Sequence, residues 1–286
     1  MSYKPIVFLT GILILIQICC SKQDNFPILK APYLGQKPPG MTPEIFAPGV
    51  VSTTDVLEMG CTWTPDGREF YFARSETNDV GSNWAIWGMR ETNGVWSEPQ
   101  ILGFSGVYRD FAPFTTPDGK YLLFYRMSSD EAAARQGTWI VEHKGDTWGE
   151  PRFFVDAYCL TTQDFRTFYF TTERSKETSK DIGRMTLENG VFSEPMKLEG
   201  GLNSEEWEAH GSISPDGSYI LFDRVESTFV SFRKDDNTWG RGYDLGGKFH
   251  VPSVSPDGKY LFFESKGDIY WVDAKIIEDL KSDELK

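Results

Sequence analysis

The sequence predicts an all-β protein, a five-bladed β-propeller, from three observations. Aromatic residues make up 15% of the 286 residues, and 27 Gly and 16 Pro supply many turns. Aromatic side chains fit pleated strands, and Gly and Pro separate short strands from one another. A turn motif repeats at intervals of 41 to 52 residues along the chain. The strand after each turn is apolar on both faces, which indicates a sheet covered on both sides, as in propeller blades.

The repeated turn has the pattern Ser/Thr-Pro-Asp-Gly in four copies, and a fifth, degraded copy has lost both Pro and Gly. Pro sets φ for the first turn position, Asp tolerates the second, and Gly takes the left-handed third. Each copy predicts a three-residue hairpin loop, which sets residues at equal distances from the Asp opposite each other. The turn aspartates are Asp66, Asp118, Asp164 (the degraded copy), Asp216 and Asp257. A phenylalanine predicted to lie in the core follows each by six residues, at Phe72, Phe124, Phe170, Phe222 and Phe263.

Each repeat predicts a four-stranded antiparallel blade: an inner strand, the Asp turn, a second strand, a loop, a third strand, a Trp- or Phe-containing turn and an outer strand. The fifth repeat ends after its third strand, at residues 268–273. Residues 45–52 are therefore predicted to supply the missing outer strand, so that an N-terminal strand closes the ring. Six blades are the alternative, if the segment before residue 45 contains another.

The repeated unit [ST]-P-D-G-[RK]-x-[LF]-x-F resembles the WD40-like repeat known as PD40. This repeat occurs in TolB-like propellers and in many lipoproteins of the Bacteroidetes. The resemblance covers residues 40–275, and the third repeat departs from the pattern. It implies the propeller fold and leaves the function open, because such propellers serve binding, scaffolding and catalysis alike.

The first 19 residues resemble the signal peptide of a bacterial lipoprotein. Residues 6–18 are mostly apolar and uncharged, too short a run to span a membrane, and they lead directly into two cysteines. Cys20 is the predicted lipidation site, with Cys19 as the alternative; a plain secretory signal is the other interpretation. Residues 20–44 are predicted to form a tether, residues 45–274 the propeller and residues 275–286 a charged tail. Lipidation would anchor the protein to a bacterial membrane, by preference the outer membrane, facing the periplasm or the cell surface.

Composition excludes several function classes. The formal net charge of −13 argues against nucleic acid as a partner. Four cysteines are too few for a scaffold built from disulfides, and no Cys-x-x-Cys pair indicates structural zinc. The sequence contains no Gly-rich phosphate loop, no His-Glu-x-x-His motif and no Ser-His-Asp order typical of hydrolases.

The candidate ligand-binding residues are found by counting eight positions from each turn Asp. In three repeats the count gives an acid before the turn and an arginine after it, and hairpin geometry sets them side by side at the mouth of the central channel. Such pairs either tie two strands together or form a charged ring for a polar ligand, a sugar or a cation. Asp156, in the degraded repeat, has no facing arginine. The pairs are Glu58–Arg74, Asp110–Arg126 and Glu208–Arg224.

A divalent cation is the one cofactor that the sequence suggests. His210 and His250 begin the inner strands of neighbouring blades, close to Glu208, and the three are candidate metal ligands. Their spacing matches no established metal motif, and the two histidines have opposite strand parity.

The leading hypothesis is a membrane-anchored propeller, without catalysis, that binds a protein or polysaccharide ligand at the loop face of its central channel. The rival hypothesis is a carbohydrate-active enzyme, a glycoside hydrolase or lyase, that uses the carboxylates of the channel mouth. The arginines facing Asp110 and Glu208 argue against the rival, because a nearby cation is expected to lower the pKa of a carboxylic acid.

Overall fold

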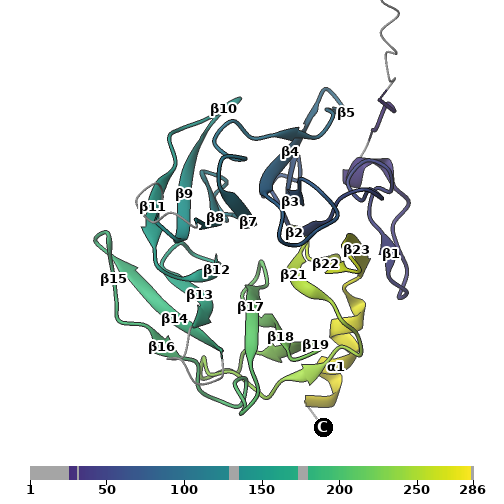
Figure 1. Cartoon of the computed structure of the whole chain (residues 1–286). Helices are drawn as coiled ribbons and strands as arrows, with labels where there is room; N and C mark the ends of the chain where they lie inside the picture. The colour runs from purple at the N-terminus through teal and green to yellow at the C-terminus, as the bar shows by residue number, and fades with distance from the viewer. Residues whose placement is uncertain (1–25, 31, 129–134, 173–179, 285–286) are drawn as a thin grey trace, which may run out of the picture.

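The computed structural model describes residues 26–30, 32–128, 135–172 and 180–284. Five antiparallel sheets stand around a central axis as the blades of a propeller, which confirms the predicted fold and number of blades (Figure 1). The inner strands are β2, β7, β12, β17 and β21. Each inner strand packs against those of the adjacent blades, so that the inner strands surround a narrow axis and apolar layers lie between the blades.

Four blades are continuous in sequence. Blade 1 contains β2 (Glu58–Trp63), β3 (Glu69–Ser75), β4 (Trp84–Thr92), β5 (Val95–Trp96) and β6 (Gln100–Ile101). Blade 2 contains β7 (Arg109–Thr115), β8 (Tyr121–Met127), β9 (Gly137–Lys144), β10 (Thr147–Trp148) and β11 (Arg152–Val155). Blade 3 contains β12 (Tyr158–Thr162), β13 (Thr167–Thr172), β14 (Asp181–Glu188), β15 (Val191–Phe192) and β16 (Met196–Lys197). Blade 4 contains β17 (Glu208–Ile213), β18 (Tyr219–Arg224), β19 (Ser227–Phe232) and β20 (Tyr243–Asp244).

Blade 5 joins the two ends of the described chain. Its strands are β21 (His250–Val254), β22 (Tyr260–Ser265), β23 (Asp268–Asp273) and β1 (Glu44–Ile45). The predicted closure by an N-terminal strand is confirmed, but the closing strand is only two residues long, and of the predicted residues 45–52 only Ile45 belongs to it. The chain then turns at Ala47 and Gly49, both with positive φ, and Ser52 returns to bond the carbonyl and the amide of Ile269 through its hydroxyl, at 3.1 Å each.

The N-terminal segment before β1 packs on the propeller within the region predicted as a tether. A 3₁₀ turn, η1 (Pro32–Gly35), places Leu34 in the core formed by blades 1 and 5. The Tyr33 hydroxyl donates a hydrogen bond of 2.8 Å to Asp257, in the turn of blade 5. At the other end, α1 (Lys275–Glu284) docks Ile277 into the core of blades 4 and 5. Among the described residues, no helix has the length and apolar character needed to cross a membrane.

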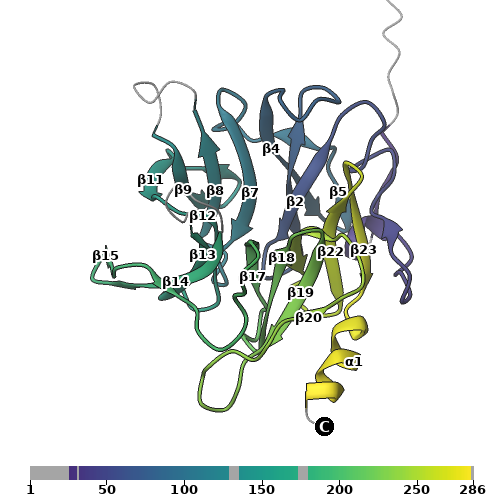
Figure 2. The same ribbon diagram turned by 60° about the horizontal axis from the view of Figure 1, so that its bottom comes forward.

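The two ends of the ring differ. The turn face carries the Asp turns, and α1 lies beside those of blades 4 and 5 (Figure 2). The loop face, at the opposite end, is where the inner strands begin. Each inner strand contains a β-bulge near this face. At the bulge, Gly60, Ala112, His210 and Val251 all adopt a left-handed backbone, with φ between 50 and 54°. Such a backbone is costly for a β-branched residue such as Val251, and strained positions concentrate at functional sites.

The degraded turn of blade 3 is one residue shorter than its counterparts. Five residues separate the paired Thr162 and Phe168, whereas six separate Trp63 and Phe70 in blade 1. Loss of Pro and Gly thus shifts the inner strand of blade 3 by one position relative to the turn.

Candidate functional site

The three predicted acid–arginine pairs form, and they lie inside the blades. Each acid is the direct cross-strand partner of its arginine, and the shortest N–O distances are 2.9 Å for Glu58–Arg74, 2.7 Å for Asp110–Arg126 and 2.8 Å for Glu208–Arg224. All three acids are 0% exposed. The pairs are not among the residues that line the narrow axial cavity, of about 40 Å³, which the bulges surround.

Each of these arginines also bonds the chain segment that enters its blade. Arg126 donates to both carboxylate oxygens of Asp110 and to the carbonyl of Phe104. Its guanidinium carbon lies 4.8 Å from the ring centres of both Tyr108 and Trp139. Arg74 and Arg224 make the same type of carbonyl contact. The pairs therefore tie the entering loop to the first two strands, and their role in ligand binding stays a prediction.

The prediction that the facing arginine lowers the pKa of Asp110 is wrong. Burial raises the pKa of Asp110, and likewise that of Glu58, because the cost of desolvating the charge exceeds the attraction of the paired arginine. Full burial nevertheless keeps both acids away from any substrate, so the raised pKa gives neither acid a catalytic role.

Asp156 does not occupy the position that the count assigned to it. Because the turn of blade 3 is one residue shorter, Ala157 takes the place that Glu58, Asp110 and Glu208 hold in the other blades. Asp156 lies in the bend before β12 and is exposed. Asp156 therefore does not stand at the position predicted for it in the ring of charges at the channel mouth.

A different set of polar side chains meets at the loop-face end of the axis, where blades 3, 4 and 5 join. His210 Nδ1 lies 2.6 Å from Oδ2 of Asp223, and His250 Nδ1 lies 3.5 Å from the same oxygen. On its other side, His210 Nε2 lies 3.0 Å from the Tyr158 hydroxyl. Thr228 donates to the second oxygen of Asp223 at 3.0 Å. We refer to Tyr158, His210, Asp223 and His250 as the axial cluster.

The electrostatics of the axial cluster follow from the burial of Asp223, which is 1% exposed. Burial alone would favour the neutral acid, but hydrogen bonds from His210 and His250 outweigh it and lower the pKa of Asp223. The hydrogen bond to Asp223 in turn raises the pKa of His250 from its ordinary value of 6.5. The cluster therefore holds a buried carboxylate beneath imidazoles whose side chains are 18% and 34% exposed, for His210 and His250.

The fold itself does not require these residue types. At the position of Asp223 the other blades carry Ala73, Tyr125, Thr171 and Glu264. At the position of His210, blades 1, 2 and 5 carry Gly60, Ala112 and Val251. Blades 1, 2 and 3 thus carry uncharged residues at the position of Asp223, blade 5 carries a second carboxylate there, and an imidazole above a carboxylate is required by neither arrangement.

The structure does not bring the predicted metal ligands together. Glu208 bonds Arg224 and Ser204, and it is Asp223 that contacts both His210 and His250. Within the described ranges, no group of three or more His, Cys, Asp or Glu side chains is arranged to hold a metal ion.

The sequence identified His210 and His250, because they begin the inner strands of neighbouring blades, but it missed Asp223 and Tyr158. Asp223 was visible as an acid in the otherwise apolar strand at residues 219–223. Tyr158 carried no comparable signal, because its contact with His210 crosses from one blade to the next.

No protein-family model and no curated protein matches the chain. Among solved structures, a TolB-like protein from Agrobacterium tumefaciens, described as a "putative TolB", aligns with a TM-score of 0.48 and 17% identity over 73% of this chain and 69% of that one. A gluconolactonase from Xanthomonas campestris aligns with a TM-score of 0.46 and 11% identity, over 86% and 97%. Hydrazine synthase of Kuenenia stuttgartiensis aligns with a TM-score of 0.39 and 14% identity, over 76% and 71%. At these TM-scores and identities no activity follows from the similarity.

Proposed function

We propose that the protein is a lipid-anchored propeller that binds an acidic polysaccharide at the loop-face mouth of its channel, through the axial cluster. The observation that carries the proposal is the convergence of His210 and His250, from adjacent blades, on one buried carboxylate. The channel cavity beside them is only about 40 Å³, so the ligand rests on the mouth and inserts no more than a small group.

The ligand class follows from what the axial cluster exposes. Asp223 is buried and its oxygens are occupied, and both ring nitrogens of His210 are engaged, by Asp223 and by the Tyr158 hydroxyl. His250 contacts Asp223 through Nδ1 and is 34% exposed, so its Nε2 is the donor that the axial cluster offers to a ligand. The ammonium of the exposed Lys180 lies 5.4 Å above the Tyr158 ring. Donors with positive charge match the carboxylates and hydroxyls of a uronic acid polymer.

Binding of trigalacturonate, trimannuronate and a hyaluronan hexasaccharide, measured by isothermal titration calorimetry, tests the proposal. We expect at least one to bind, and His250→Gln to weaken that binding by about tenfold, the loss of one charge-assisted hydrogen bond. His143→Gln, on blade 2, is the matched control. If none of the three binds, or if His250→Gln binds as the wild type does, the proposal is wrong.

The same titrations, repeated at several pH values, test whether the positive charge of His250 strengthens binding. Asp223 and Glu264 raise the pKa of His250, burial and Lys248 oppose them, and the net direction is upward. His250 therefore stays protonated to a higher pH than a free histidine, and binding should be strong at pH 6 and lost as pH rises through the raised pKa. His250→Gln should flatten this profile.

A second candidate function, a polysaccharide lyase, is favoured by the chain of contacts from Tyr158 through His210 to Asp223. An imidazole held by a carboxylate can accept the phenolic proton, and the resulting phenolate can remove the C5 proton beside a uronate carboxyl group. The electrons of that bond form the C4–C5 double bond as the C4–O glycosidic bond breaks, and the protonated imidazole or water returns a proton to the leaving oxygen. Elimination leaves a conjugated double bond that absorbs ultraviolet light. Absorbance that grows with the wild type and not with Tyr158→Phe would establish the lyase; no growth with any of the three substrates would leave binding as the function.

The lipid anchor lies outside the described residues and is proposed from the sequence. Fatty-acid labelling of the bacterial host should mark the wild type and Cys19→Ser, and should fail with Cys20→Ser. Labelling lost only with Cys19→Ser would move the anchor to Cys19. Equal labelling of wild type and a double Cys19→Ser/Cys20→Ser variant would refute the anchor, and fractionation would then show no outer-membrane association.

A further inference from the structure

The turn face holds a pocket on the axis of the ring, at the opposite end from the axial cluster. It has a volume of about 220 Å³ and is formed by the last residues of the five inner strands and by the turns after them. Hydroxyl groups line much of its wall, including those of Thr62, Thr115, Ser212 and Ser253. Of the described residues that line it, none is charged, in a chain whose formal net charge is −13.

One hydroxyl of this axial pocket lacks a partner. Thr115 is 7% exposed, and its Oγ1 makes no hydrogen bond. The backbone amide of Thr115 donates to Thr62 Oγ1 at 3.1 Å. This bond fixes the backbone of Thr115, while its side-chain hydroxyl has no hydrogen-bond partner. A buried polar group without a partner costs free energy, which a bound ligand removes by supplying the missing hydrogen bond.

The degraded turn adds an amide to the rim of the same pocket. Four blades place a proline there, Pro65, Pro117, Pro215 and Pro256, and blade 3 places Gln163. Proline offers no side-chain hydrogen bond, whereas an amide both donates and accepts. The change that shortened the turn of blade 3 therefore also put a polar group at the edge of the pocket.

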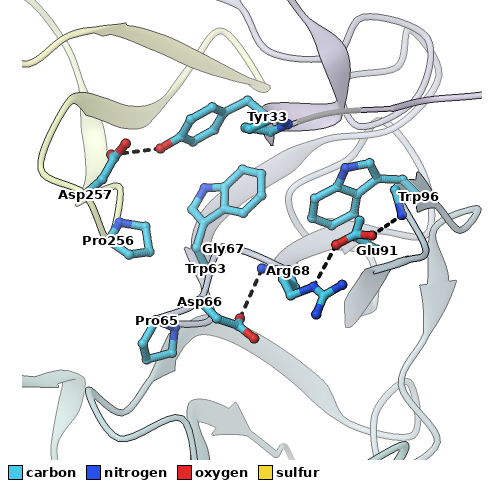
Figure 3. Close-up of a pocket in the computed structure, with 12 residues that line it drawn as sticks. Tyr33, Trp63, Pro65, Asp66, Gly67, Arg68, Glu91, Trp96, Pro256 and Asp257 are labelled. Atoms are coloured by element: carbon cyan, nitrogen blue, oxygen red, sulfur yellow. Dashed lines mark hydrogen bonds and ion pairs between the residues drawn. The ribbon is translucent and has the colours of Figure 1, made fainter.

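A second pocket, of about 470 Å³, adjoins the first toward blades 1 and 5, and Trp63, Pro65 and Pro256 line both. Figure 3 shows Trp63 next to Tyr33, with Asp257 at the hydroxyl end of Tyr33 and the Asp66 turn below Trp63. Trp63 is 5% exposed, and its indole N–H has no hydrogen-bond partner.

The polar rim of this outer pocket is mostly acidic. Asp66 and Asp257 lie at the turns, and Glu91 is paired with Arg68 at 2.7 Å. The half-buried ring of Tyr33 offers the aromatic surface of this pocket, beside the nearly buried Trp63. An aromatic ring with carboxylates around it suits a sugar, because apolar C–H groups pack on the ring and hydroxyls donate to the carboxylates.

From these two pockets we propose that the turn face binds a neutral oligosaccharide, with one sugar ring in the axial pocket and the next against Tyr33 and Trp63. Hydroxyls are the groups that accept from the Trp63 N–H and also donate to carboxylates. The carboxylates repel an anion, and a cation cannot accept the N–H hydrogen bond. Together the pockets fall in the range of about 300–1,000 Å³ typical of ligand sites.

Titration of the wild-type propeller with maltotriose, cellotriose, xylotriose and mannotriose tests the proposal. We expect at least one to bind with a Kd below about 1 mM. Thr115→Val should weaken that binding by about fivefold, the loss of one neutral hydrogen bond, while keeping or raising the melting temperature, because it removes an unpartnered buried hydroxyl. Thr92→Val, at the exposed end of β4, is the matched control.

Three outcomes overturn the proposal: none of the four trisaccharides binds, Thr115→Val binds as tightly as Thr92→Val, or His250→Gln abolishes the binding, which would move it to the loop face. Gln163→Ala keeps the test open if Thr115→Val does not fold, with the same expected weakening; equal binding by Gln163→Ala and the wild type would then overturn the proposal. Acidic oligosaccharides, which test the loop face, should not compete with the bound trisaccharide. The proposals for the loop face and for the turn face can therefore be refuted independently.

Discussion

Arg126→Ala is expected to lower the free energy of unfolding by about 3–5 kcal/mol, because it leaves the carboxylate of Asp110 buried without its partner. Asp110 is 0% exposed, and Arg126 donates two hydrogen bonds to it, of 2.7 and 2.9 Å. The substitution also removes the bond to the carbonyl of Phe104 and the packing between Tyr108 and Trp139. Urea denaturation followed by far-ultraviolet circular dichroism measures the effect.

Arg68→Ala is the matched control, because Arg68 makes a contact of 2.7 Å with Glu91 but its side chain is 57% exposed. Solvent screens exposed pairs and leaves them little effect on stability, so the control should unfold almost as the wild type does. Similar losses for Arg68→Ala and Arg126→Ala would show that burial does not set the strength of these pairs. The sequence predicted these pairs at the mouth of the channel, and their burial is the reason that a large loss of stability is expected.

Removing the closing segment is expected to have the largest effect on the fold. A chain that begins at residue 55 lacks β1, Phe46 and Val51, and both of these side chains are 0% exposed. Loss of one buried phenylalanine costs about 3–5 kcal/mol, and typical domains have only about 5–15 kcal/mol in total. The truncated chain should show no cooperative thermal transition, because β23 also becomes an unpaired edge.

Two longer chains complete the series. A chain that begins at residue 26 keeps every described contact and should melt as the full-length mature protein does. A chain that begins at residue 41 keeps β1 but loses Tyr33 and Leu34, which pack in the core of blades 1 and 5, and should melt at a lower temperature. Equal melting of the chains that begin at 26 and 55 would refute the role of the closing segment.

Local chemistry explains why the ring was predictable and the axial cluster was not. Pro, Asp and Gly specify a turn within four residues, and turn geometry then fixes cross-strand pairs such as Glu58 with Arg74. The same count failed at Asp156, because the length of a hairpin depends on residues that the degraded copy had lost. Tyr158, His210 and Asp223 meet through bulges and across blades, so no spacing along the chain encodes their contact.

The pairing of β1 with β23 also determines the order in which the blades form during folding. Ser52 and Ile269, which hydrogen-bond each other, are 217 residues apart, and no partner for β1 exists until the end of the chain has been made. The four continuous blades can assemble from neighbouring hairpins, whereas the fifth must wait while its outer strand stays exposed at the other end of the chain. Contacts of such long range slow folding, so ring closure should be the slowest step of folding. Until then the exposed edge of β23 is open to pairing with another chain, and a chaperone that covers strand edges would act at this stage.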